Sequence, residues 1–205
     1  MNSQLLSKHM MDPAGLHRAL RSIERQSQRC SQVLKALLEF SRQATSGREW
    51  FQAGVLVDRV LDAIRPEAQR RDVRLEAVLP PAGAPWVHVN AAEVESALGN
   101  VVTNALQVSA PGATVQVEVR PRERGGRNGV EVTVRDSGPG IPAHVLPHVF
   151  DPFFTTKPPG EGMGLGLALA RRFIDDQGGA VQVESEEGHG TGVRLWMPAK
   201  AGEKP

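Results

Sequence analysis

The sequence of 205 residues predicts an α+β fold, a two-layer α/β sandwich in which helices cover one face of a mixed, mostly antiparallel sheet. Two observations carry this prediction. Apolar residues recur at helical spacing within the first 48 residues, whereas helical spacing and strand-like alternation take turns from about residue 49 onward. Several strand-like stretches follow one another directly with glycine-containing connections, which favours antiparallel pairing.

Residues 1–48 are expected to contain the end of one helix, a turn and a complete second helix. Asp12-Pro13 and Gly15 mark the turn. The second helix, over residues 16–43, has a thin apolar seam that it cannot bury alone, so it calls for a partner helix. We interpret the region as a helical hairpin whose first helix is cut short. The seam consists of Leu16, Leu20, Ile23, Val33, Leu34, Leu37, Leu38 and Phe40.

Residues 49–200 are expected to form the sandwich, followed by a tail over residues 201–205. Pro66 is expected near a bend or a boundary of its helix, because proline lacks the backbone N–H that a helix interior uses. Pro111-Gly112 ends the next helix, and the glycines of 125–129 supply a hairpin turn. In chain order the expected elements are a helix over 55–72, strands over 73–80 and 86–90, a helix over 91–109, strands over 114–120 and 130–136, a helix over 166–179, and strands over 180–185 and 192–199.

Composition narrows the possible functions. Twenty-four basic and 23 acidic side chains give a formal net charge of +1, which does not favour a general nucleic-acid or anionic-membrane binder. The single cysteine, Cys30, excludes an internal disulfide and fits a reducing compartment. No apolar run approaches the roughly 18–20 residues that span a bilayer, and the N-terminus lacks the order of a secretory signal. We expect a cytoplasmic location, with no nucleic-acid partner and no membrane contact in this chain.

Asn100 and Asn104 lie four residues apart, on one face of the helix over 91–109. One interpretation is a pair of capping or surface amides. The other is a metal site, because Mg²⁺ keeps most of its waters and uses few protein oxygens together with substrate phosphates. In that interpretation Asn104 holds the metal, and Asn100 supports the same phosphates or the water shell.

Asp136 ends a strand and is followed by Gly138 and Gly140. Its carboxylate could accept a hydrogen bond from an exocyclic amine such as that of adenine. The glycines would let a flat ring approach the backbone. Taken alone, the pattern also describes many turns.

Phe150, Phe153 and Phe154 lie close together in a Pro- and Gly-rich segment and are three of only six phenylalanines. They either pack into the core or form the aromatic docking surface of a mobile lid. Lys157, in the same segment, either reaches a terminal phosphate or is a solvated loop lysine.

Glycines occupy positions 160, 162, 164 and 166, directly before a helical pattern. Unpaired backbone N–H groups and the helix dipole favour an anion at such a helix start. We therefore expect Gly162, Gly164 and Gly166 to cradle phosphates. Their spacing matches neither the dinucleotide-binding motif nor the Walker loop.

Taken in order, these four motifs resemble the N, G1, F and G2 boxes of the catalytic domain of sensor histidine kinases of two-component systems: NVVTNA, DSGPG, FDPFFTTK and GMGLGL. GHGTGVRLWMP resembles the closing strand segment of that family, with Thr191 near the adenine. ALLEFSR resembles the end of the second helix of the dimerisation and phosphoacceptor hairpin. The resemblance implies the Bergerat ATP-binding fold, with residues 1–48 as part of the hairpin and 49–200 as the ATP-binding catalytic domain.

The resemblance also implies ATP and Mg²⁺ as cofactors and transfer of the γ-phosphoryl group to a histidine, for relay to a response regulator receiver domain. It implies a homodimer through the hairpin and a parent protein that could be membrane-anchored. The catalytic residues would be Asn100, Asn104 and Lys157, with Asn104 as metal ligand. The cofactor-binding residues would be Asn100, Asn104, Asp136, Gly138, Gly140, Lys157, Gly162, Met163, Gly164, Leu165, Gly166, Leu167 and Thr191.

Two departures from the family pattern bear on the reaction. The acceptor motif of the family is a histidine followed by an acidic residue, with a proline a few places on. No histidine of this sequence has this context. We therefore expect the acceptor upstream of residue 1 and no autophosphorylation of this chain. Related ATPases of the gyrase, mismatch-repair and heat-shock types carry a general-base glutamate where this chain has Asn100, whose amide cannot take a proton. This favours transfer to an external nucleophile over hydrolysis. The histidines are His9, His17, His88, His144, His148 and His189.

Two alternatives stay open. One is a nucleotide-responsive interaction module without transferase activity, which the missing acceptor supports. The other is an anti-sigma-type serine kinase, which shares the ATP fold but does not normally carry a dimerisation hairpin, so the helix over 16–43 weighs against it.

Overall fold

The computed structural model describes residues 15–24, 26–27, 47–80, 84–158, 162–200 and 202. The chain divides into two compact units, Met1–Gln43 with Lys157–Met163, and Ala44–Thr156 with Gly164–Pro205. In the first unit, residues 15–24 are helical, as predicted for the beginning of the helix over 16–43. The predicted first helix, the Asp12-Pro13 turn, Cys30 and most of the tail lie outside the described residues.

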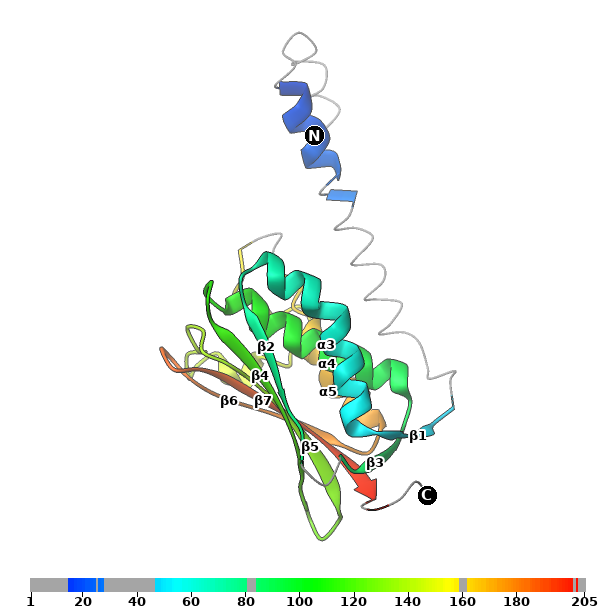
Figure 1. Cartoon of the computed structure of the whole chain (residues 1–205). Coiled ribbons are helices and arrows are strands. Elements are labelled where there is room, and N and C mark those ends of the chain that lie inside the picture. Colours follow the sequence, from blue (N-terminus) through cyan, green and yellow to red (C-terminus); the bar gives the residue numbers. More distant parts are fainter. Residues whose placement is uncertain are drawn as a thin grey trace. The chain divides into compact units, whose positions relative to one another are not determined.

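The second unit is built on a sheet to which seven strands contribute within the described residues (Figure 1). The strand order is β1-β3-β7-β5-β4-β2, and β6 also pairs with β7. The pair of β2 and β4 is parallel and the other pairs are antiparallel, so the predicted mixed, mostly antiparallel sheet is confirmed. The strands are β1 (Glu49–Gln52), β2 (Arg74–Val78), β3 (Trp86–Val89), β4 (Thr114–Pro121), β5 (Gly129–Asp136), β6 (Ala180–Glu186) and β7 (Gly190–Lys200).

Strand β7 lies in the middle of this sheet. One edge pairs with β5, from Asp136 opposite Thr191 to Gly129 opposite Pro198. The other edge pairs first with β6 and then, at Ala199 and Lys200, with β3. Asp136 and Thr191, predicted as site residues from distant parts of the sequence, are therefore directly opposite each other.

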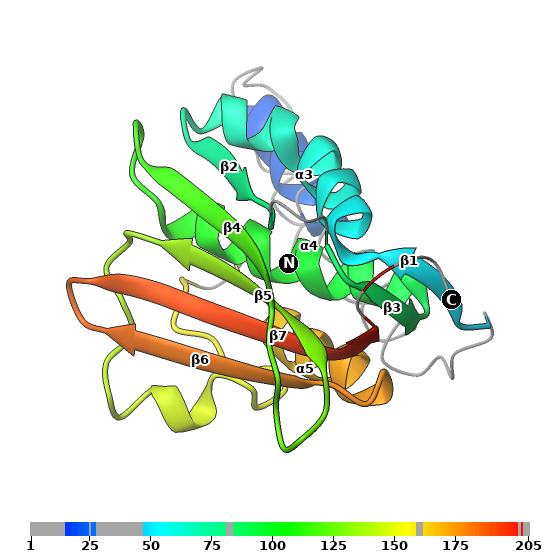
Figure 2. The same cartoon turned by 60° about the horizontal axis from the view of Figure 1, so that its bottom comes forward.

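Three helices cover one face of the sheet, α3 (Ala53–Arg70), α4 (Ala91–Val108) and α5 (Gly166–Asp176) (Figures 1 and 2). The core lies between these helices and the sheet, because alternate strand residues point inward and are buried. This confirms the predicted two-layer sandwich. The buried strand residues include Val115, Val117 and Val119 of β4, Val130, Val132 and Val134 of β5, and Val193, Leu195 and Met197 of β7.

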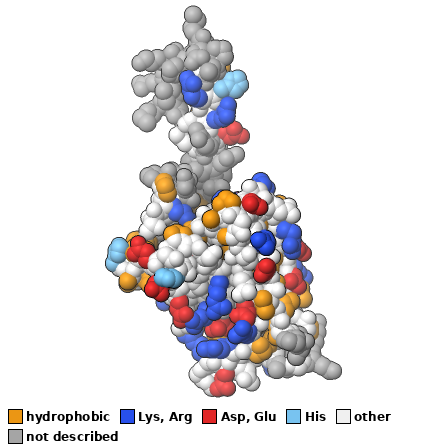
Figure 3. All heavy atoms as spheres, turned by 60° about the vertical axis from the view of Figure 1, so that its left-hand side comes forward, with side chains coloured by type: hydrophobic (Ala, Val, Ile, Leu, Met, Phe, Trp, Pro, Cys, Tyr) orange, Lys and Arg blue, Asp and Glu red, His pale blue; other side chains and the backbone are white. Residues whose placement is uncertain are grey.

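Charged side chains alternate with these apolar ones and pair with one another. Glu118 contacts both Arg120 and Arg135, and Arg194 contacts Glu184. On the surface shown in Figure 3, basic and acidic side chains likewise lie beside one another. The mixture of signs agrees with the near-neutral composition and leaves no single-sign surface in this view for a polyanion.

The hairpin of β4 and β5 has the predicted glycine turn, with Gly125 and Gly126 at φ 57° and 73°. Near its base the indole of Trp196 lies over Gly129, where a Cβ atom would come 2.4 Å from the ring. The Trp196 Nε1–H donates to the Arg122 carbonyl at 2.8 Å. This side chain, 5% exposed, fixes the hairpin on β7.

Three details differ from the prediction. Pro66 lies inside α3, which continues to Arg70 because Ala68 is buried and the last turn is hydrogen-bonded. The short strand β1 and the 3₁₀ turn at Leu146–His148 (η1) were not expected from the sequence.

In the part of the chain that is described, no helix combines the length and apolar character needed to cross a membrane.

Candidate functional site

Asp136 lies at the end of β5 with its carboxylate half-buried. Its Oδ1 atom accepts hydrogen bonds from the backbone N–H groups of Gly138 at 2.9 Å and Thr191 at 3.2 Å. Burial raises the pKa of Asp136, and these two N–H groups act in the opposite direction. No described residue donates to Oδ2. One carboxylate oxygen is thus fixed by the fold while the other can accept a hydrogen bond from a ligand.

The glycines after Asp136 are required by contacts within the chain. Gly140 has φ 71°, and a Cβ atom there would come 2.0 Å from the carbonyl oxygen of Glu186. The N–H of Gly188 donates to the carbonyl of Pro139 at 2.7 Å. The loop over residues 137–141 therefore packs on the turn between β6 and β7. A glycine is therefore required at position 140 by the fold itself, which the sequence did not indicate. The expected contact of Gly140 with a flat ring stays a prediction.

Ser185, near the end of β6, joins the same loop and turn and was not predicted from the sequence. Its Oγ atom accepts from the N–H of Ile141 at 2.8 Å and lies 2.7 Å from the carbonyl oxygen of Gly190. It also lies 2.9 Å from Oγ1 of Thr191. A strand serine just before a glycine-rich turn is the only sequence signal that could have pointed to it.

Asn100 and Asn104 are half-buried on α4 and face the start of α5. A Cβ atom on Gly166 would lie 3.4 Å from Nδ2 of Asn104 and 3.8 Å from Oδ1 of Asn100. Leu165, which precedes the helix, is buried and provides no side-chain cap to its N–H groups. The fold thus brings the two asparagines and the glycine-rich helix start together, although more than 60 residues separate them in the sequence.

Gly164 ties the phenylalanine-rich segment to the glycine-rich one. Its carbonyl accepts from the N–H of Phe153 at 2.9 Å, and a Cβ atom on it would come 2.4 Å from the Phe153 carbonyl carbon. Phe153 has φ 68° and a side chain that is 61% exposed. A positive φ is a costly conformation for an aromatic residue, so the surrounding contacts hold it there.

The other two phenylalanines are half-buried rather than members of the core. Phe150 lies under the guanidinium of Arg171, 5.2 Å from the ring centre. The ring of Phe154 lies 5.6 Å from that of His148, whose Nδ1 is 2.8 Å from Oδ2 of Asp151. These contacts weigh against the interpretation of the phenylalanines as core residues.

The remaining predicted site residues divide between the two units. Leu167 follows Gly166 in α5 and is half-buried. Lys157, Gly162 and Met163 belong to the unit that contains the N-terminal residues. Their roles toward a nucleotide stay predictions.

A bound Mg²⁺ would take most of its ligands from water and from the phosphates of a nucleotide rather than from the protein. Among the described residues, no group of three or more His, Cys, Asp or Glu side chains is placed to hold a metal ion. A single amide oxygen fits an ion that takes its other ligands from water and phosphates. Asn104 fits that role because the anion-favouring start of α5 lies beside it.

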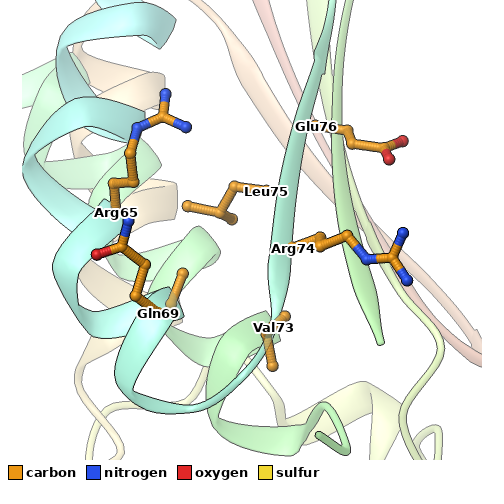
Figure 4. A pocket seen from close by; sticks show the side chains of 7 residues that line it. Arg65, Gln69, Val73, Arg74, Leu75 and Glu76 are labelled. Atoms are coloured by element: carbon orange, nitrogen blue, oxygen red, sulfur yellow. The ribbon is translucent and has the colours of Figure 1, made fainter. Parts of the chain in front are cut away.

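A shallow cavity of about 270 Å³ lies between the end of α3 and β2 (Figure 4). Leu75 points toward α3, whereas Arg74 and Glu76 point to the other side of the strand. None of the predicted site residues lines this cavity. Its lining residues are Arg65, Ala68, Gln69, Val73, Arg74, Leu75 and Glu76.

Three comparisons show which known proteins the chain resembles. A profile of the family described as "Histidine kinase-, DNA gyrase B-, and HSP90-like ATPase" matches residues 89–201. Sensor histidine kinase ZraS of Escherichia coli K12 is 31% identical over 194 residues, which cover 94% of this chain and 40% of that protein. The mycobacterial sensor histidine kinase MprB has a structure with a TM-score of 0.64 and 28% identity, over 75% of this chain and 98% of that one.

A further solved structure is similar over most of the chain. It is the histidine kinase ThkA in complex with the response regulator protein TrrA, with a TM-score of 0.76 over 95% of this chain and 55% of that one. At 23% identity, this likeness concerns the fold. The chain itself spans between about one fifth and two fifths of the length of the curated relatives that it matches.

Proposed function

The chain belongs to the family of histidine kinase-, DNA gyrase B- and HSP90-like ATPases, and on this premise we propose that it is the ATP-binding catalytic part of a sensor histidine kinase. It binds ATP with Mg²⁺ and transfers the γ-phosphoryl group to a histidine imidazole. Residues 49–200 form the catalytic domain, and residues 1–48 form part of the dimerisation hairpin.

One observation supports this proposal above the others, the meeting of Gly166 with Asn100 and Asn104. Uncapped N–H groups at the start of α5 favour phosphate, and the amide oxygen of Asn104 suits a metal ion bound to the same phosphates. A Cβ atom at position 166 would lie in van der Waals contact with both asparagine side chains, so the helix start and the two amides are direct neighbours. The arrangement therefore accommodates a metal-bound polyphosphate.

The base of the nucleotide is assigned to Asp136. Its Oδ2, to which no described residue donates, accepts a hydrogen bond from the exocyclic amine of adenine, and Thr191 lies beside it. Gly138, Gly140, Gly164, Leu165 and Leu167 complete the nucleotide site within this unit in the proposal. The roles of Gly162, Met163 and Lys157 toward the nucleotide are assigned from the sequence motifs alone. ATP is thereby held by the base at one end and by the phosphates at the other.

The reaction is proposed as transfer rather than hydrolysis. Phosphoryl transfer depends mainly on positioning and on neutralisation of charge, so it needs few acid–base groups from the protein. Asn100 stands where a water-activating glutamate would be required, and an amide cannot accept a proton. Mg²⁺, when bound, neutralises phosphate charge, while Asn100 and Asn104 orient the phosphates and the ion.

The partners follow from the same proposal. We assign a response regulator receiver domain as the final acceptor, since the similar ThkA forms a complex with such a protein. We also assign a homodimer through the hairpin and a cytoplasmic location, where ATP is available.

Titration calorimetry with the β,γ-imido analogue of ATP and Mg²⁺ tests the nucleotide site. We expect saturable binding to the native chain, loss of binding in Asp136→Ala, and loss of the magnesium dependence in Asn104→Ala. Ser109→Ala is the control, because Ser109 follows α4 and its hydroxyl donates to the Ala105 carbonyl in the last turn of that helix. A folded native chain that does not bind the analogue would contradict the proposal.

Transfer is tested separately with radiolabelled ATP and a hairpin that carries a histidine acceptor motif, added in trans. Acid-labile label on that histidine supports the kinase. Binding of ATP without any label would instead favour the interaction module.

A further inference from the structure

We infer that Ser185 is a positioning residue of the nucleotide site. Its Oγ atom accepts a hydrogen bond from the Thr191 hydroxyl, so that Thr191 and Asp136 both present hydrogen-bond acceptors to the base. The inference rests on the proposed nucleotide function. It adds a determinant of base selection from a residue that does not itself contact the ligand.

The three residues lie side by side on neighbouring strands. Thr191 of β7 is directly opposite Asp136 of β5 on one side and directly opposite Ser185 of β6 on the other. Residues directly opposite each other in a sheet project to the same face. Ser185 therefore reaches Thr191 from the side away from the carboxylate.

The contacts of Ser185 allow one arrangement of protons. The Gly190 carbonyl, 2.7 Å away, can only accept, so the single proton of Ser185 is donated there. The Ile141 N–H, 2.8 Å away, can only donate, so it uses one lone pair of Ser185. The contact of 2.9 Å with Thr191 Oγ1 then requires the proton of Thr191, which fills the second lone pair.

In this arrangement the Thr191 hydroxyl has no proton left to donate to a ligand. Thr191 presents lone pairs, and Asp136 presents the lone pairs of Oδ2, which no described residue uses. A 6-aminopurine donates two N–H groups toward such acceptors. A 6-oxopurine places a carbonyl oxygen there, which can be accommodated only when Thr191 turns its proton toward the ligand. Ser185 opposes that rotation because it would lose the hydrogen bond from Thr191.

The preference between two nucleotides is the quantity that tests this role. We would measure dissociation constants of the β,γ-imido analogues of ATP and ITP with Mg²⁺ for the full chain and for Ser185→Ala. The native chain should prefer the ATP analogue. Loss of one hydrogen bond of ordinary strength should reduce the ATP-to-ITP preference by about three- to tenfold in Ser185→Ala. If Ser185 had only a structural role, its loss would weaken the binding of both analogues by the same factor and leave the preference unchanged.

Two further variants locate the effect at the Thr191 hydroxyl. In a Thr191→Val background, Ser185→Ala should not change the preference further, because no hydroxyl is left to orient. Ser109→Ala, which removes a serine hydroxyl bonded to a carbonyl elsewhere, should keep the native preference. If Ser185→Ala does not fold, Ser185→Cys takes its place, since it is close in size and a weaker acceptor, and the same reduction is expected.

The outcomes separate this inference from the proposal beneath it. An unchanged preference in the serine variant, or an equal change in the Thr191→Val background, would overturn the inference while leaving the nucleotide site intact. A folded native chain that binds neither analogue would overturn the proposed function and the inference together.

Discussion

Removal of the Gln177 side chain is expected to loosen α5 from the beginning of α4. Gln177 directly follows α5 and is 5% exposed. Its Oε1 accepts from the backbone N–H of Asn90 at 3.0 Å, and its Nε2 donates to Oε2 of Glu93 at 2.6 Å and to the Phe173 carbonyl at 3.2 Å. Asn90 is the N-cap of α4, and its side chain accepts from the Glu93 N–H. One amide therefore links the two helices that bring the glycine-rich segment and the asparagines together.

The size of the effect follows from these contacts. Loss of a neutral hydrogen bond costs about 1 kcal/mol, and loss of one to a carboxylate costs about 1.5–3 kcal/mol. Water can reach the half-buried Glu93 and replace part of the second bond. We expect Gln177→Ala to lower the free energy of unfolding by about 2–3 kcal/mol, which corresponds to a decrease in Tm of about 4–12 °C for a chain of this size.

In a Gln177→Glu variant, the loss of stability should depend on pH. The variant keeps an acceptor for Asn90 but places a second carboxylate against Glu93, whose pKa burial already raises. A carboxyl whose folded pKa lies above its unfolded pKa contributes stability that is present below the unfolded pKa and is lost as the pH rises through the folded pKa. The variant should therefore be closest to the native chain in acid and lose stability toward neutral pH.

Urea denaturation at several values between about pH 5 and about pH 8 measures both effects, since the change in midpoint reports stability when the slope is constant. A Gln177→Ala variant within about 0.5 kcal/mol of the native chain would refute the reasoning, because such a loss is typical of an ordinary surface position. A deficit of Gln177→Glu that does not vary with pH would refute the role assigned to Glu93.

Four further predictions concern three positions. Asp136→Asn should abolish ATP binding without lowering the ligand-free Tm at pH 7. The Tm should not fall because burial raises the pKa of Asp136 and disfavours its ionised form. Differential scanning fluorimetry with and without nucleotide checks both results. For the same reason the native affinity for ATP should fall on acidification, beginning above the ordinary pKa of 3.8, and calorimetry across pH measures it. Gly140→Ala should destabilise the fold by about 2–4 kcal/mol and weaken ATP binding, since its Cβ would come 2.0 Å from the Glu186 carbonyl at a positive φ. Gly129→Ala should displace the Trp196 indole and cost about 1–3 kcal/mol, seen as a lower urea midpoint with red-shifted fluorescence.

The elements that could be predicted from the sequence are those with long, regular patterns. The helix over 91–109 has a clear apolar period and a proline and glycine after it, and α4 ends one residue earlier. Strand β1 has four residues, too few for a period, and forms because β3 pairs with it more than 30 residues later. Such a strand depends on tertiary pairing rather than on local preference.

The candidate site shows the same division. Asp136 could be identified because a carboxylate before two glycines is a local pattern. Ser185 could not, because its role depends on Ile141 and Thr191, which only the folded sheet brings to it. The reason for Gly140 was missed for a similar cause, since the atom that excludes a side chain there belongs to Glu186 at the end of β6.

The central place of β7 has a consequence during protein synthesis. Of the seven described strands this is the last in the sequence to leave the ribosome, yet β5, β6 and β3 all pair with it. Until residues 190–200 emerge, β5 and β6 lack their shared neighbour and expose unpaired edges, which are sites of aggregation. The domain should therefore close late, in a step limited by long-range pairing, and a ribosome that stalls before Gly190 should release a chain that depends on chaperones.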